Sequence, residues 1–168
     1  MSEKPPTPII SLREFIDQLE ILNDQCQPYL NIRTGEFTIL TEEWKLTVRR
    51  LEEEEDPLSQ FDIEWQKEAY QEAREILYSE DYLSLPTQYD IHEYQIMKDF
   101  CYEVAPEHLR HRLLDAISGR GAFRRFKEAV YHFGIRDQWF RYRKQAFKDI
   151  AIGWLELNGF EYIDDVEI

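Results

Sequence analysis

Several residue types are scarce in this sequence, and each scarcity argues against a class of protein. Only two cysteines, Cys26 and Cys101, occur in 168 residues, and no CxxC or Cys/His metal spacing surrounds either of them. We therefore expect no disulfide scaffold, and two reduced thiols that are at least partly buried, as in proteins of a reducing compartment. Six glycines and seven prolines, with 43% hydrophobic residues, place the chain far from disordered sequences.

Long apolar runs are absent as well. No segment approaches the roughly 18 consecutive apolar residues of a membrane-spanning helix. The N-terminal MSEKPPTPII lacks the basic-then-apolar order of a signal peptide. The sequence therefore predicts a soluble, cytoplasmic protein with no membrane partner.

The length suits one domain, because single domains commonly run to roughly 100 to 200 residues. Within it we expect a loose arm over residues 1–10, a helix and a β-hairpin over residues 11–56, and a helical region over residues 57–168. The predicted fold class is α+β, mainly α, with several amphipathic helices packed with a small antiparallel β-hairpin.

Local signals support this order of elements. Ser11 and Glu14 have the spacing of a capping box at the start of the first helix, and Thr34-Gly35 between alternating apolar residues predicts a tight hairpin turn. A lone hairpin is unstable in water, so further strands are needed. The other expected elements are strands near residues 82–85 and 160–163, and helices from Pro57, over 90–103, from Pro106, and on both sides of residues 133–135.

The last two expected helices each carry an apolar stripe that we expect in the core. The first stripe consists of Phe123, Phe126, Val130 and Phe133. The second consists of Phe140, Phe147, Ile150, Ala151, Trp154 and Leu155.

Positive charge is scarce overall but gathered in one segment. The net charge is −14, whereas nine Lys and Arg stand against two acidic residues between Gly119 and Lys148, a local net charge of +7. The remainder therefore carries −21, and such an acidic field disfavours nucleic acid as a partner without excluding it. We expect the basic segment to meet an acidic protein partner or a phosphate-bearing ligand. The Glu52–Asp56 run is an intramolecular or intersubunit candidate for it.

Gly119-Arg120-Gly121 stands where a helix is expected to begin. Free backbone N–H groups and the positive end of the helix dipole would then point at one spot, and Arg120 and Arg124 could close over an anion there. The candidate anion-binding residues are Gly119, Arg120, Gly121, Arg124, Arg125, Lys127, Arg141 and Lys144. The alternative is structural. The glycines then permit a sharp turn between packed helices, and the arginines, Arg120 among them, pair with carboxylates or donate to the carbonyls of a neighbouring helix end.

No motif demands an enzyme, and we assign no catalytic residue, metal ligand or cofactor. His108 and His111 are three residues apart, but no HExxH and no cysteine partner accompany them. One alternative is an enzyme acting on a phosphorylated or nucleotide substrate, with His92 or Glu93 as acid or base and the Gly119–Gly121 turn holding phosphate. Another is a self-assembling homo-oligomer, in which acidic and basic faces of separate copies meet.

The block Ser118–Lys127, SGRGAFRRFK, together with Trp139 and the Ala151–Leu155 end, resembles a bacterial uncharacterised protein family of the UPF series. The likeness continues through most of the chain, at Tyr29-Leu30, Thr34-Gly35-Glu36 and Asp90–Glu93. It implies a bacterial source and implies that the GRGAFRRFK block is the hallmark of the family. It implies no function, substrate or cofactor, so the block is open to both interpretations given above.

Overall fold

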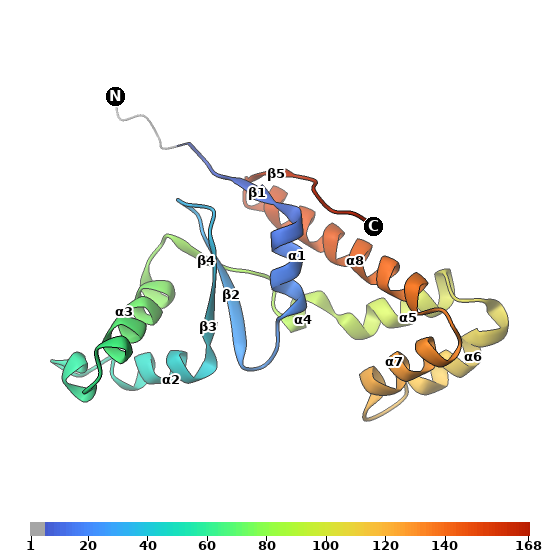
Figure 1. Ribbon diagram of the computed structural model, residues 1–168, viewed down its shortest axis with the longest axis horizontal. Coiled ribbons are helices and arrows are strands. Elements are labelled where there is room, and N and C mark those ends of the chain that lie inside the picture. Colours follow the sequence, from blue (N-terminus) through green and yellow to red (C-terminus); the bar gives the residue numbers. More distant parts are fainter. Residues whose placement is uncertain (1–5) are drawn as a thin grey trace.

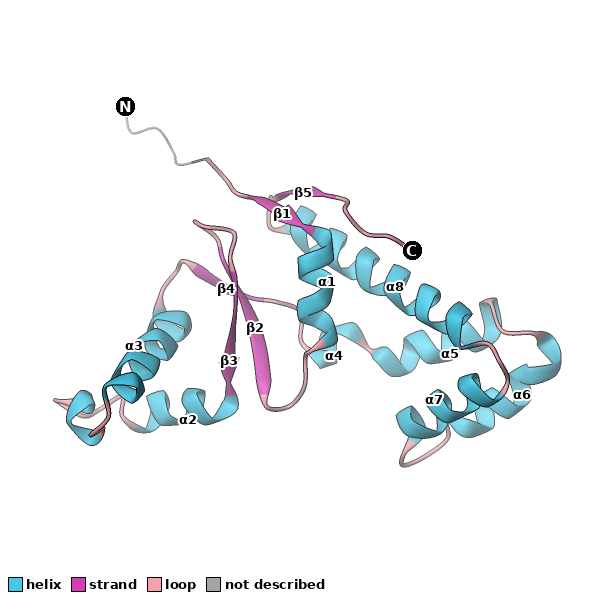
Figure 2. Cartoon of the chain, viewed as in Figure 1, coloured by secondary structure: helices cyan, strands magenta, loops and turns pink. Residues whose placement is uncertain are grey.

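The computed structural model describes residues 6–168 and shows a mainly helical α+β fold, as predicted (Figures 1 and 2). Its elements are β1 (Ile9–Ser11), α1 (Leu12–Glu20), β2 (Cys26–Asn31), β3 (Phe37–Thr41), α2 (Glu42–Arg50), a 3₁₀ turn (Pro57–Gln60), α3 (Glu64–Tyr78), β4 (Tyr82–Ser84), α4 (Gln88–Ile91), α5 (Glu93–Glu103), α6 (Glu107–Ala116), α7 (Ala122–His132), α8 (Arg136–Leu157) and β5 (Glu161–Ile163). No described helix combines the length and the apolar character that a membrane span needs.

The predicted hairpin is confirmed, and it forms part of a three-stranded antiparallel sheet with the order β3-β2-β4. Asn31 shapes its turn, because its side-chain oxygen accepts hydrogen bonds from the main-chain N–H groups of Arg33 and Thr34 at 3.0 and 3.2 Å. Gly35 follows with a φ of +78°, and a Cβ at this position would lie 2.9 Å from the Cβ of Pro8. The first of the two extra strands that the sequence suggested, β4, completes the sheet.

The second extra strand, β5, pairs in parallel with β1 and not with the hairpin. Ser11 caps α1 as predicted, since its hydroxyl oxygen accepts from the Glu14 N–H at 3.1 Å. The same hydroxyl donates to Asp165 at 2.6 Å, and Asp165 also accepts from the Arg13 N–H at 2.9 Å. These bonds attach the C-terminal segment to the N-terminus of α1.

Two clusters of buried apolar side chains hold the elements together. The larger cluster joins α1 to α5–α8, and in it Trp139 of α8 packs against Phe126 of α7 and Phe100 of α5 at ring distances of 4.8 and 5.4 Å. The smaller cluster joins α2 and α3 to the sheet. Its buried members are Leu40, Val48, Leu51, Tyr70, Ala73 and Ile76.

The two ends of the molecule differ in charge. We call residues 42–80, with α2 and α3, the acidic lobe; they include thirteen Asp and Glu against five Lys and Arg, a net charge of −8. We call residues 107–141, with α6, α7 and the start of α8, the basic lobe; they include eight Lys and Arg against four Asp and Glu, a net charge of +4. Figure 1 shows α2 and α3 at one end of the long axis and α6 and α7 at the other.

Some local expectations differ from the structure. The expected arm covered residues 1–10; residues 1–5 lie outside the described residues, and Ile9-Ile10 form part of β1. Pro57 opens a 3₁₀ turn, and the following helix begins only at Glu64. Helix α2 was not expected at all, because its apolar stripe is short; Thr41 caps it by accepting from the Trp44 N–H at 3.3 Å.

The expectation that Phe123 and Phe140 lie in the core is wrong, because each side chain is 46% exposed. On α8 the inward position belongs to Trp139, which is 2% exposed. The buried stripe of this helix continues from Trp139 to Phe147, two steps of four residues, and Phe140 points about 100° away from it. On α7, Phe126 is buried as predicted, while Phe123 lies in the first turn at the rim of a cleft.

The attachment of the chain ends makes a testable contribution to stability. We expect Ser11→Ala to lower the free energy of unfolding by about 1 to 2 kcal/mol, because it removes the N-cap of α1 and the hydroxyl donor to Asp165. Urea denaturation measures this loss. Ser59→Ala is the control, since the exposed Ser59 hydroxyl only donates to a main-chain carbonyl; an equal loss in both variants would contradict the assignment.

The same contact should depend on pH. Hydrogen bonds from Ser11 and from the Arg13 N–H lower the pKa of Asp165. Because the folded pKa is depressed, the stabilisation is present above the unfolded Asp value of about 3.9 and is lost as the pH falls through the lower folded value. The difference between wild type and Ser11→Ala in urea denaturation should therefore shrink below about pH 4. An unchanged difference at low pH would mean that the Asp165 carboxylate does not contribute.

Candidate anion-binding site

The block singled out by the sequence forms the joint between α6 and α7. Helix α6 ends at Ala116 and α7 begins at Ala122, and the two helices lie side by side (Figure 1). Gly119 and Gly121 have φ values of +75° and +74°, a left-handed conformation that residues with a Cβ seldom adopt. The glycines therefore permit the sharp turn between the packed helices.

Arg125 closes this joint. Its Nε donates to the carbonyl oxygen of Ala116 at 2.9 Å, and its two terminal nitrogens donate to the carbonyl oxygens of Ser118 and Arg120. The last carbonyls of a helix have no partner within the helix, and a planar guanidinium can serve several of them at once. Arg125 thus performs the role of holding a helix end that the sequence suggested for Arg120.

The neighbours of Arg125 point elsewhere. Arg124 is 85% exposed along its side chain and forms an ion pair with Glu128 at 3.0 Å. Arg120 and Lys127 are exposed, and neither side chain forms an ion pair with another residue in the described part of the chain. That these three side chains bind an anion stays a prediction, and the geometry leaves them accessible for it.

The two candidates on α8 are partly engaged. Lys144 donates to the main-chain oxygen of Glu167 at 2.8 Å and so holds the C-terminal segment. Arg141 is exposed, with its Nε 3.4 Å from the main-chain oxygen of Asp137 one turn earlier. Of the two, only Arg141 presents its charge to solvent in the basic lobe.

Exposed aromatic side chains accompany the exposed cations. Phe123, Arg124, Lys127 and Tyr131 share about a third of the circumference of α7, because residues three, four and seven apart lie on one side of a helix. Tyr131 is 72% exposed. We call these four residues, with Arg120 at the preceding turn, the basic face. On α8, Arg136 lies over the exposed Phe140 ring at 5.0 Å and repeats the same pairing of charge and aromatic surface.

A cleft of about 210 Å³ borders the basic face. Phe123 and Lys127 of α7 line it together with Arg143 of α8. The Nε of Arg143 donates to Glu93 at 2.7 Å, and its guanidinium lies 4.2 Å from the centre of the Phe147 ring. Sequence reasoning missed Arg143 as a site residue; the signal was its position midway between Trp139 and Phe147, which places a cation on the buried stripe of α8.

The enzyme alternative required His92 or Glu93 close to the anion site. The cleft includes Glu93, which is bound to Arg143, but it includes neither His92 nor Arg120 nor Arg124. His92 is exposed and links α4 to α5 with a φ of +52°. The cleft therefore brings Glu93 together with Lys127, and the enzyme alternative stays a prediction.

The remaining reactive side chains are scattered. Across residues 6–168 no group of three His, Cys, Asp or Glu could hold a metal ion. His111 lies 3.3 Å from Asp115 on the surface of α6. Cys101 is buried, which raises the pKa of its thiol to about 11, while Cys26 is half-buried. A thiol with a raised pKa is a poor nucleophile.

Comparison with known proteins identifies relatives of the chain. The sequence profile of the uncharacterised protein family UPF0158 matches residues 7–167. A UPF0158 protein of Pseudomonas aeruginosa is 30% identical over 67 residues, which cover 39% of this chain and 44% of that protein, so the match spans less than half of the relative. No solved structure matches the chain. The family implied by the resemblance is confirmed, while the GRGAFRRFK block as its hallmark stays a prediction.

The different roles of two adjacent arginines can be tested. We expect Arg125→Ala to lower the free energy of unfolding by about 2 kcal/mol, because it removes the charged donor from three carbonyl oxygens. Arg124→Ala is the matched control, with an expected change within about 0.5 kcal/mol, since its ion pair is exposed. Thermal and urea unfolding measure both. Equal losses would show that Arg125 does not hold the joint.

Proposed function

Since the chain belongs to the UPF0158 family, whose description assigns no activity, we propose a function from the molecule itself: it is a binding protein that holds an acidic segment of a partner protein against the basic face of α7. One observation carries this proposal. Exposed cations and exposed aromatic rings share one side of a short helix, in a protein whose net charge is −14.

The cations of the basic face support the binding of carboxylates. The chain has 34 Asp and Glu, so cations could readily be paired internally. Arg120 and Lys127 nevertheless form no ion pair among residues 6–168, and Arg124 has only the exposed Glu128. Charges presented in this way attract an oppositely charged surface and orient it on approach.

The aromatic rings add an apolar component. Phe123 and Tyr131 expose 46% and 72% of their side chains, and aromatic residues with arginine are the types enriched at the centres of protein interfaces. A partner segment that carries carboxylates beside apolar side chains would satisfy both parts of the face. This mixed character distinguishes the face from a solvated row of charges.

A protein segment fits the charge arrangement better than nucleic acid. Helix α7 has eleven residues, about 16 Å of length, so its cations span only a short stretch of a partner. A nucleic acid carries phosphates continuously beyond that stretch and would meet the negative charge of the remaining chain. A short acidic segment of a protein can carry its negative charge only over the length of the basic face.

Fluorescence anisotropy tests this function. The probe is a labelled peptide of alternating Glu and Phe, and a labelled single-stranded RNA of equal charge is the comparison. We expect the wild type to bind the peptide, with affinity falling as salt rises, and Arg124→Gln with Lys127→Gln to weaken binding about tenfold.

The control variant is Arg13→Gln with Lys98→Gln. It makes the same change in net charge at exposed positions outside both lobes and should bind as the wild type does. An equal loss in both double variants would show only a general charge effect. Binding of the RNA alone, or of neither probe, would refute the proposed partner class.

A further inference from the structure

We infer that the acidic partner is the acidic lobe of a second copy of this chain, so that copies associate head to tail. This inference rests on the proposed function, because it assigns the partner of the same basic face. The two surfaces are already present in each molecule: the acidic lobe has a net charge of −8 and the basic lobe a net charge of +4.

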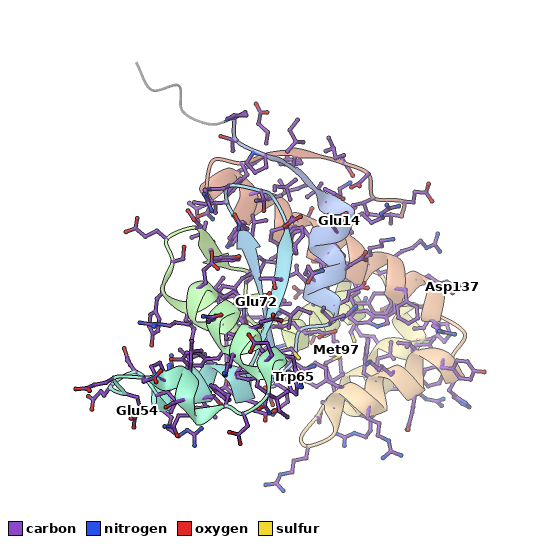
Figure 3. All side chains as sticks on the ribbon, turned by 60° about the vertical axis from the view of Figure 1, so that its left-hand side comes forward. Glu14, Glu54, Trp65, Glu72, Met97 and Asp137 are labelled. Atoms are coloured by element: carbon purple, nitrogen blue, oxygen red, sulfur yellow. The ribbon has the colours of Figure 1, made fainter. Side chains whose placement is uncertain are left out.

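The two lobes do not neutralise each other within one molecule. They lie at opposite ends of the long axis in Figure 1, and Figure 3 shows Glu54 projecting at the outer tip of the acidic lobe, on the side of the molecule opposite Asp137. No ion pair among the described residues joins residues 42–80 to residues 107–141. Each lobe therefore offers its charge to another molecule.

The acidic lobe also has an apolar recess that the charge count does not show. A cavity of about 530 Å³ opens between the 3₁₀ turn and α3. Leu58, Tyr70 and Tyr78 supply its apolar surface, and Tyr78 is 50% exposed. The carboxylates of Asp56 and Glu75 stand at the same cavity, with Arg74 as the single cation in its lining.

The chemical groups of this recess are complementary to those of the basic face. A guanidinium binds both to carboxylates and to the faces of tyrosine rings, and an exposed phenylalanine fills apolar space. Arg120, Phe123 and Arg124 provide these groups at the α6–α7 joint, which the clamp by Arg125 holds in place. The acidic lobe therefore offers both the carboxylates and the apolar surface that the basic face can bind.

The arrangement also determines the form of the assembly. The contact joins two different surfaces, so each added copy leaves one free acidic lobe and one free basic face, and the result is an open chain or a closed ring. Two copies at −14 each repel at long range, but at physiological salt this repulsion is screened beyond about 8 Å. Contacts within the interface act at shorter distances.

Sedimentation velocity of two variants and their mixture tests the inference. The first variant, Arg124→Gln with Lys127→Gln, weakens the basic face; the second, Asp56→Asn with Glu75→Gln, weakens the acidic lobe. We expect the wild type to form species larger than a dimer as its concentration rises and to dissociate at high salt. Each variant alone should associate about tenfold more weakly. All four substitutions are to neutral residues, so that no new attraction between opposite charges arises when the two variants are mixed.

The equimolar mixture gives the decisive result. Each variant retains the surface that the other lacks, so the mixture should form a one-to-one complex that grows no further. A wild type that stays monomeric overturns the inference, as does an Asp56→Asn, Glu75→Gln variant that associates as the wild type does. In either case, binding of the acidic peptide to the basic face would still support the proposed function. A wild type that neither associates with itself nor binds the acidic peptide would refute the inference and the proposed function together.

Discussion

The packing of α8 is the interaction on which the rest of the structure depends. Trp139, Phe147, Ala151 and Leu155 form one buried stripe along this helix, and α1, α5 and α7 all contact it. Burying each of the three large side chains contributes about 1.5 to 3 kcal/mol, whereas an exposed ion pair contributes about 1 kcal/mol or less. Apolar burial on α8 therefore positions α1, α5 and α7, and the exposed charges of the basic lobe contribute little to this packing.

The joint between α6 and α7 shows how one basic block can be both structural and exposed. Adjacent residues on a helix point about 100° apart. With Arg125 directed at the carbonyls of the α6 end, Arg124 must point to solvent, and Lys127 lies on the side of Phe123 and Tyr131. The structural and binding interpretations of the block therefore concern different side chains and do not compete.

The separation of the acidic lobe from the basic lobe follows from the arrangement of the two hydrophobic clusters. Two hydrophobic clusters, one beneath α2 and α3 and one along α8, hold the acidic and basic lobes apart. Among residues 6–168, neither Arg120 nor Lys127 forms an ion pair, and Arg124 has only the exposed Glu128, in a chain with fourteen more acidic than basic residues.

By itself, the sequence determined the features that depend on a few adjacent residues: the cap at Ser11, the hairpin turn at Thr34-Gly35, the helical content, the segment of net positive charge and the family. Only the tertiary structure decided which of two neighbours faces inward, Trp139 and not Phe140, and which arginine holds the helix end, Arg125 and not Arg120. It also decided that β5 pairs with β1. The physical reason is that the hydrogen bonds of caps and turns join residues a few positions apart. Burial, strand pairing and the partners of a charged side chain depend on residues distant in the sequence. The Ser11–Asp165 hydrogen bond, for example, joins residues 154 positions apart.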